Sequence, residues 1–205
     1  MFSNKHPFLT AFSLALGSAI ALGLARFSYG LLLPIMKEDL DWSYLVAGAM
    51  NTANALGYFI GALTSPMLMR RMSVHRFFIS ASVVTGIFLY LSGCTDNTSL
   101  LFVLRVIAGI ASAWIFVAGG VLVSQLGSIH ANRSGLLLGI YYGGPGLGIF
   151  ISTLAVPFFN GWGMSAQLEH SWQLAWYALG ALCIVLTLVL VKPIASIPAI
   201  PPKPM

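Results

Sequence analysis

The stretch "SAIALGLARFSYGLLLP" (residues 18–34) is almost wholly apolar and holds one charged residue, Arg26. Lys5 precedes this stretch, so its first part could be the hydrophobic region of a signal peptide. The apolar run resumes after Arg26 as "YGLLLPIM", which makes it longer than such a region. We therefore expect a retained helix that crosses a membrane over about residues 8–36.

The composition of the whole chain agrees with a membrane environment. Of 205 residues, 58% are hydrophobic and 7% are charged, whereas about 25% are charged in an ordinary soluble domain. These charged side chains are too few to cover the surface of a soluble fold. We therefore expect the lipid bilayer to surround the protein. The net charge of +5 does not indicate nucleic-acid binding, because the basic residues fall in short segments between apolar runs.

Five further apolar runs follow the first. They do not alternate with a period of two, which excludes an outer-membrane barrel. We predict an all-α membrane protein whose six transmembrane helices, within residues 1–191, cover about residues 8–36, 43–69, 77–94, 99–127, 134–159 and 172–191. A Pro-rich segment, 192–205, is expected to follow as a cytoplasmic tail.

The distribution of charge predicts the orientation of these helices. With a cytoplasmic N-terminus, seven basic residues lie in inner segments and only Lys37 lies outside, together with all five acids. The inner basic residues are then Lys5, Arg70, Arg71, Arg76, Arg133, Lys192 and Lys203. The positive-inside rule therefore predicts that both termini are cytoplasmic.

A faint internal repeat relates the two halves of the chain. "LGYFIGALTSP" (residues 56–66) and "LGIFISTLAVP" (residues 147–157) are identical at six of eleven positions. The first lies in an inward helix and the second in an outward helix. This placement is typical of an inverted repeat that relates helices one to three to helices four to six.

The turn between the second and third helices, "GALTSPMLMRRMSVHR" (residues 61–76), resembles the signature loop of the major facilitator superfamily of secondary transporters. In that loop a glycine is followed by a basic cluster, and the residues that fit here are Gly61, Arg70, Arg71 and Arg76. The acid that the superfamily carries near Ser65 is missing. A loop that only satisfies the positive-inside rule is the alternative.

The segment "RVIAGIASA" (residues 105–113) is similar to the fourth helix of the same superfamily. Arg105 is followed four residues later by Gly109, although Ala108 stands where a Gln is expected. The resemblance implies that Arg105 takes part in proton coupling, as in relatives. Gly109 also leaves a flat face on which a neighbouring helix can pack.

The segment "GLLLGIYYGGPGLG" (residues 135–148) resembles the Gly-Pro motif of the superfamily's antiporters. Gly144, Pro145 and Gly148 match, whereas Ile149 departs from the pattern. Pro145 is expected to kink the helix. A nucleotide-binding loop is excluded, because no Lys-Ser/Thr follows the glycines and no strand precedes them. Small residues four apart, such as Gly144 and Gly148, are otherwise a packing device.

The resemblance covers the N-terminal six-helix bundle of such a permease. It implies a multi-pass protein of the bacterial inner membrane that transports a small-molecule substrate by alternating access. The second bundle would come from a second copy or a separate C-terminal half. The alternative is a truncated or non-transporting membrane protein that acts as an assembly or regulatory partner.

The position of Arg26 within an apolar helix predicts a polar binding site. An arginine near the bilayer centre costs about 3–17 kcal/mol. Arg26 lies roughly 16 Å along the helix from Lys37, which is too far for its side chain to reach the outer surface. We therefore expect a polar cavity, which the resemblance places between helices one, two, four and five. A lipid-facing side chain that snorkels toward the surface is the alternative. The candidate substrate-binding residues are Arg26, Asn51, Asn54, Tyr58, Arg105, Tyr141 and Tyr142. Polar contacts between packed helices are the alternative for the stripe formed by Asn51, Asn54 and Tyr58.

The six predicted spans contain no Asp or Glu. Two arginines without acidic partners favour an anionic ligand, because each guanidinium offers a planar fork to a carboxylate or phosphate. The sequence has none of the motifs HExxH, GxSxG or paired intramembrane carboxylates. We therefore predict no enzymatic activity, no catalytic residue, no metal and no cofactor.

Overall fold

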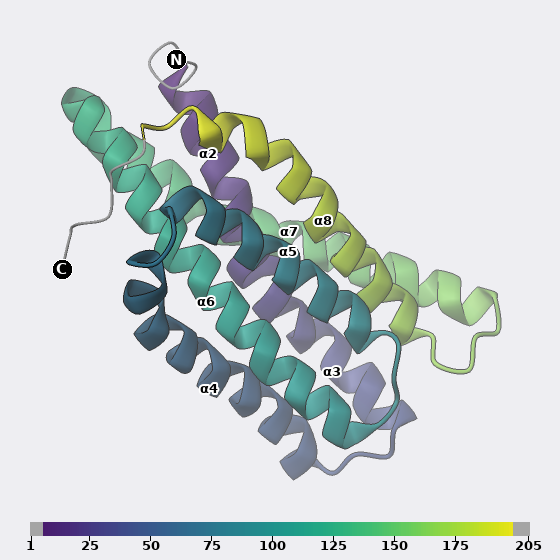
Figure 1. The fold of residues 1–205 in the computed structure, drawn as a ribbon. Coiled ribbons are helices and arrows are strands. Elements are labelled where there is room, and N and C mark those ends of the chain that lie inside the picture. The colour runs from purple at the N-terminus through teal and green to yellow at the C-terminus, as the bar shows by residue number, and fades with distance from the viewer. Residues whose placement is uncertain (1–5, 199–205) are drawn as a thin grey trace.

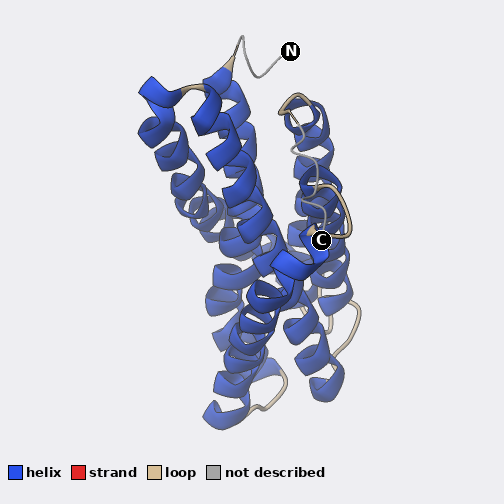
Figure 2. Cartoon of the chain, turned by 60° about the vertical axis from the view of Figure 1, so that its left-hand side comes forward, coloured by secondary structure: helices blue, strands red, loops and turns tan. Residues whose placement is uncertain are grey.

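The computed structural model of the chain describes residues 6–198, and every regular element in that part is helical. The first rod is continuous and consists of α2 (Pro7–Ser18), the π-helix η1 (Ala19–Phe27) and α3 (Ser28–Asp39). It is followed by α4 (Tyr44–Met69), α5 (Val74–Ser92), α6 (Thr98–Ile129), the short 3-10 helix η2 (Ala131–Arg133), α7 (Ser134–Ser165) and α8 (Trp172–Ala195). The long helices form one bundle (Figure 1), and Figure 2 shows no strand among the described residues. The all-helical fold class is therefore confirmed for residues 6–198.

Five helices of the described part are long and apolar enough to cross a membrane. They are Pro7–Asp39, Val74–Ser92, Thr98–Ile129, Ala131–Ser165 and Trp172–Ala195. The helix missing from this set is α4, which we expected as the second of the six spans. Its 26 residues would span about 39 Å, so its length is sufficient. Its hydropathy is lower because it carries two asparagines, two threonines and three glycines.

Of the helices that extend beyond their predicted ends, α7 and α8 do so by the most residues. α7 runs through Pro145 and Pro157 to Ser165, past the expected end at residue 159. α8 continues through Pro193 to Ala195, into the segment expected as a tail, because the fixed φ of proline is itself compatible with a helix. The remainder of the predicted tail from residue 199 onward, with Lys203, lies outside the described residues, as does Lys5.

Polar side chains begin three of the helices. The side chain of Ser43 accepts a hydrogen bond from the backbone N–H of Val46 at the start of α4. Ser73 does the same at the start of α5, and Asn97 at the start of α6. Each cap satisfies a backbone donor that has no partner within its helix.

Glycines bring neighbouring helices into backbone contact. A Cβ added at Gly57 of α4 would lie 2.1 Å from the carbonyl oxygen of Val106 in α6. A Cβ at Gly144 of α7 would lie 2.1 Å from the carbonyl oxygen of Ala15 in α2. The other motif glycines, Gly61, Gly109 and Gly148, are equally close to a neighbouring backbone. Small residues allow such close packing in lipid, where helices gain little hydrophobic energy by association.

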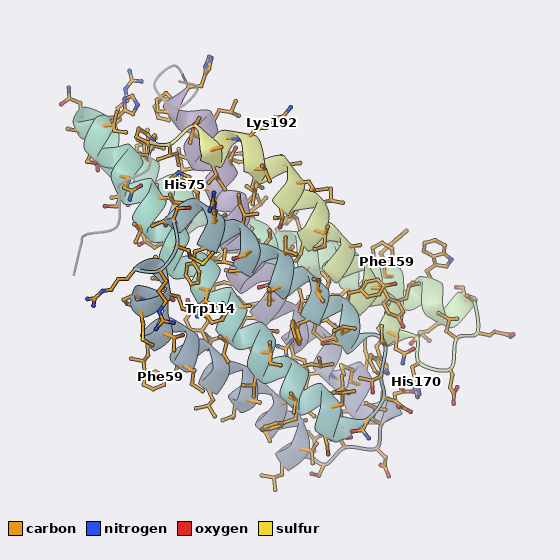
Figure 3. The ribbon with its side chains drawn as sticks, in the orientation of Figure 1. Phe59, His75, Trp114, Phe159, His170 and Lys192 are labelled. Carbon is orange, nitrogen blue, oxygen red and sulfur yellow. The ribbon has the colours of Figure 1, made fainter. Side chains whose placement is uncertain are left out.

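Basic and acidic side chains gather at opposite ends of the bundle. The start of α2, the end of α8 and the α4–α5 turn share one end (Figure 1), where His75 Nε2 lies 2.9 Å from the carbonyl oxygen of Ile197. Figure 3 shows Lys192 at this end and His170 at the other. At the other end, Asp39 Oδ2 lies 2.6 Å from His170 Nδ1 and accepts a hydrogen bond from Trp172 Nε1. The exposed residues at the basic end include Arg70, Arg71, Arg76 and Arg133.

Candidate functional site

Arg105 lies in the packed interior of the bundle and has 2% exposure. Its guanidinium is 4.6 Å from the ring centroid of Tyr29 and 5.2 Å from that of Trp176. Its Nη2 donates to the carbonyl oxygen of Ala25 at 3.3 Å. Its Nε and Nη1 have no hydrogen-bond partner in the described structure. Arg105 therefore connects α6 to the first rod and to α8.

The predicted polar stripe on α4 is divided between three environments. Asn54 is buried between α4 and α6, where its Nδ2 donates to the carbonyl oxygen of Arg105 at 3.0 Å. Asn51, one turn earlier, is exposed, and Tyr58, one turn later, is half-buried. Asn54 thus contributes a contact between packed helices, which was the alternative reading of this stripe.

Arg26 has surroundings quite unlike those of Arg105. It belongs to the last turn of η1 and is partly exposed. Its guanidinium lies 5.2 Å from the ring centroid of Tyr58 on α4. Within residues 6–198 it makes no ion pair with an acid. Its donors therefore remain available on the face of the bundle between the first rod and α4.

Tyr141 and Tyr142 are neighbours in α7 but have different positions. Tyr141 is fully buried, its hydroxyl donates to the carbonyl oxygen of Phe116 at 2.7 Å, and its own carbonyl oxygen accepts from Ser18 Oγ at 2.6 Å. Tyr142 is 55% exposed. Its ring centroid lies 5.1 Å from that of Tyr141 and 5.8 Å from that of Phe116. Tyr141 therefore joins α7 to α6 and α2, whereas Tyr142 is open to a ligand.

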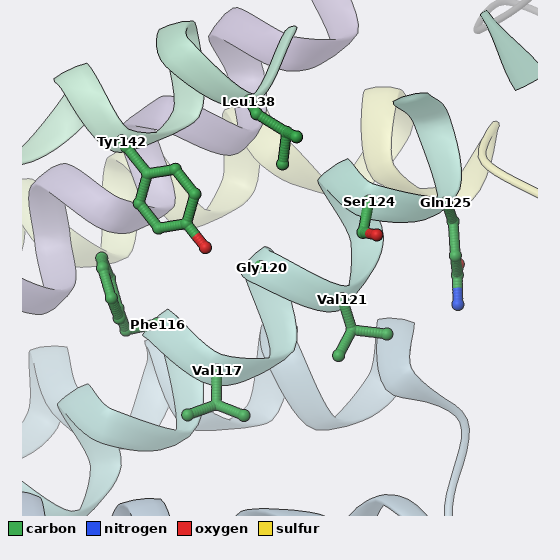
Figure 4. Close-up of a pocket in the computed structure, with 8 residues that line it drawn as sticks. All are labelled: Phe116, Val117, Gly120, Val121, Ser124, Gln125, Leu138 and Tyr142. Carbon is green, nitrogen blue, oxygen red and sulfur yellow. The ribbon is translucent and has the colours of Figure 1, made fainter. Parts of the chain in front are cut away.

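A pocket of about 610 Å³ lies between α6 and α7, and Figure 4 shows the side chains that line it. We call it the α6–α7 pocket, and it is lined by Phe116, Val117, Gly120, Val121, Ser124, Gln125, Leu138 and Tyr142. Only Tyr142 belongs to the predicted site residues. Ser124 and Gln125 are adjacent polar residues near the end of α6, and this pair was the sequence signal that could have indicated the pocket.

The structure thus brings together some of the predicted site residues and separates others. The Arg26 guanidinium meets the ring of Tyr58, and the ring of Tyr142 meets that of Phe116. A Cβ added at Gly109 of α6 would approach the backbone of Tyr58, and Phe116 lies two turns later on the same face of that helix. Arg105 and Asn54 lie in closed helix contacts. A guanidinium held on an aromatic ring can form two parallel hydrogen bonds with a carboxylate or phosphate. Among residues 6–198, no three His, Cys, Asp or Glu side chains are placed to hold a metal ion.

The comparison with protein families agrees with this architecture. A family model described as an uncharacterised MFS-type transporter, YbfB, matches residues 18–204, which is most of the chain. The match includes the helices that carry Arg26, Arg105 and the Gly-Pro motif. The chain is therefore a multi-pass membrane protein of the major facilitator superfamily and belongs to the YbfB-type family of transporters.

Proposed function

We propose that the chain is one six-helix half of a secondary active transporter that moves a small anionic solute by alternating access. Membership of a transporter family supports the class of activity. The anionic character of the solute rests on one observation, the guanidinium of Arg26, which lies on a partly exposed face without an acidic partner in the described residues. A second copy of the chain, or a separate C-terminal half, would supply the other bundle.

The glycine contacts support an inverted repeat within this half. The repeated segments align Gly57 of α4 with Gly148 of α7. Gly57 touches the backbone of α6, the fourth rod, and Gly148 touches the backbone of the first rod at Ala19. An inverted repeat exchanges the first rod with the fourth and the second with the fifth. The two glycine contacts are therefore equivalent under that exchange, which is the arrangement that such a repeat predicts.

We further propose that the basic end of the bundle is cytoplasmic and that the protein resides in the bacterial inner membrane. The native cysteines offer a test, because Cys94 is exposed near the acidic end and Cys183 is buried in α8. A membrane-impermeant maleimide should label Cys94 in intact cells, whereas Cys183 should stay unlabelled. Labelling of Cys94 only after cell lysis would reverse the orientation.

The anion proposal is tested by transport in proteoliposomes that contain the full chain. The liposomes are loaded with a panel of organic and inorganic anions, and exchange of each labelled anion is measured. Arg26→Gln should lower the exchange rate of the transported anion at least tenfold, since it removes charge-assisted hydrogen bonds. Arg26→Lys should retain part of the rate, because the charge remains and the planar fork is lost.

Arg133→Gln is the matched control for this experiment. Arg133 is also an exposed arginine on an aromatic ring, 5.3 Å from the centroid of Phe8, but it lies in η2 at the basic end. The rate should be unchanged in this variant. An anion exchange rate that is also unchanged in Arg26→Gln would rule out the proposed role of Arg26.

A further inference from the structure

The α6–α7 pocket is larger than a small inorganic or short-chain anion requires. Its volume of about 610 Å³ lies within the range of about 300–1,000 Å³ that is typical of sites for drug-sized molecules. Acetate or phosphate would leave most of this space to water. The size of the pocket therefore indicates a solute with an extended body.

The lining of the pocket indicates the chemistry of that body. The rings of Phe116 and Tyr142 form one end, and branched aliphatic side chains such as Val117 form the walls (Figure 4). Gly120 leaves the middle of the pocket open, because the nearest atom to a Cβ there would be the Tyr142 hydroxyl at 3.5 Å. Such a surface favours an apolar body and offers it aromatic faces.

The charged group of the solute would bind some distance from this pocket. A Cβ at Gly109 of α6 would lie 3.0 Å from the backbone nitrogen of Tyr58, so the residue that holds the Arg26 guanidinium is level with Gly109. Phe116 follows seven residues later on α6, which corresponds to about 10 Å along the helix. A solute that uses both Arg26 and the pocket must therefore carry its charge several ångströms away from its apolar body.

We propose that the solute is an elongated amphipathic organic anion, whose charged group binds Arg26 and whose apolar body fills the α6–α7 pocket. This inference rests on the proposed transport of an anion and adds the substrate class. A cationic amphiphile is disfavoured, because Arg26 occupies the face of Tyr58 and would repel it. The polar side chains of Ser124 and Gln125 mark the far end of the pocket.

The test measures binding of three related probes to the full chain in lipid nanodiscs by calorimetric titration. The probes are 4-phenylbutyrate, acetate, and the neutral 4-phenylbutanamide. The expected result is that 4-phenylbutyrate binds at least tenfold more tightly than either of the others. Arg26→Gln should weaken 4-phenylbutyrate binding to the level of the amide, and it should leave the affinity for the amide unchanged.

Gly120→Leu tests the pocket itself, because it places a side chain in the open space. It should weaken 4-phenylbutyrate binding at least tenfold while the helix is maintained, since leucine favours helix more than glycine does. Gly161→Leu is the matched control on α7, where no atom lies within 4 Å of an added Cβ. Leu138→Trp fills the pocket from the opposite helix and replaces Gly120→Leu if that variant does not fold.

The outcomes separate this inference from the proposal on which it rests. If acetate binds as tightly as 4-phenylbutyrate, with dependence on Arg26 but not on Gly120, the amphipathic class is wrong and the anion proposal stands. If the amide binds as tightly and Arg26→Gln has no effect, both proposals fail. Absence of binding by 4-phenylbutyrate also overturns the inference.

Discussion

Arg26 and Arg105 are the same residue type in two apolar helices, and the structure places them in opposite surroundings. Arg105 is enclosed by the rings of Tyr29 and Trp176 and bonds to the carbonyl oxygen of Ala25. Arg26, the next residue after that carbonyl, turns to the partly exposed face and meets Tyr58. One guanidinium therefore holds three helices together, and the other remains available to a ligand.

An intramembrane charge is therefore not by itself a binding site. A buried cation without an acidic partner is costly, and the aromatic faces around Arg105 offset part of that cost. Because its position is closed on all sides, a solute could reach it only after the helices separate. The face beside Arg26 requires no such rearrangement.

The largest effect is expected at Gly144, whose contact with α2 positions the first rod and with it Arg26. Gly144→Leu would drive a side chain into the backbone of Ala15 and the hydroxyl of Ser18, both 2.1 Å from the added Cβ. We expect a loss of more than about 3 kcal/mol in the free energy of unfolding. The measurement is the yield and melting temperature of the purified protein. Gly143→Leu, one residue earlier in open space, should fold normally, and equal melting temperatures would refute the close contact.

Substitution of Arg105 should cause the next largest loss of stability, because it opens a cavity among the rings of Tyr29 and Trp176. Arg105→Ala is expected to lower the free energy of unfolding in mixed micelles by about 2–4 kcal/mol. Arg26→Ala should lower it by less than about 1 kcal/mol, because Arg26 is partly exposed. Arg105→Met, which fills the space without unpaired donors, should recover most of the loss. Equal losses at the two arginines would remove the distinction between them.

Tyr141 and Tyr142 show the same contrast between a buried and an exposed side chain, with smaller expected effects. Tyr141→Phe removes a buried hydrogen bond of 2.7 Å to Phe116 and should cost about 1 kcal/mol. Tyr142→Phe should change the free energy of unfolding by less than about 0.5 kcal/mol, since this residue is exposed. The same unfolding measurement applies to both. A larger cost at Tyr142 would contradict the assignment of Tyr141 as the structural member of the pair.

Much of the architecture followed from the sequence, because apolar length and the absence of period-two alternation leave few options in a bilayer. The helix starts at Ser43, Ser73 and Asn97 carry ordinary capping residues. The π-helical stretch η1 was not predicted. It contains Gly23, where an added Cβ would lie only 2.3 Å from the Gly148 Cα, and such long-range contacts leave no mark in local periodicity.

The candidate site was harder to predict for a related reason. Residue type and helical spacing placed Asn51, Asn54 and Tyr58 on one stripe, but the neighbouring helix decides which of them is covered. Gly109 brings α6 against Asn54, whose carbonyl oxygen would lie 2.3 Å from an added Cβ. Half of the residues that line the α6–α7 pocket are glycine or aliphatic, and such residues look like ordinary core in a sequence.

The smallest effect is expected at Tyr58, whose ring lies under the Arg26 guanidinium. A cation–π contact at a partly exposed site contributes about 0.5–1 kcal/mol, so Tyr58→Leu should weaken 4-phenylbutyrate binding about two- to fivefold. Tyr58→Phe keeps the ring and should bind as the unmodified chain does, in the same calorimetric titration. A loss as large as that of Arg26→Gln would mean that Tyr58 contacts the solute directly. No loss at all would mean that the ring does not orient Arg26. Binding of the anion on the partly exposed face would then depend on Arg26 alone.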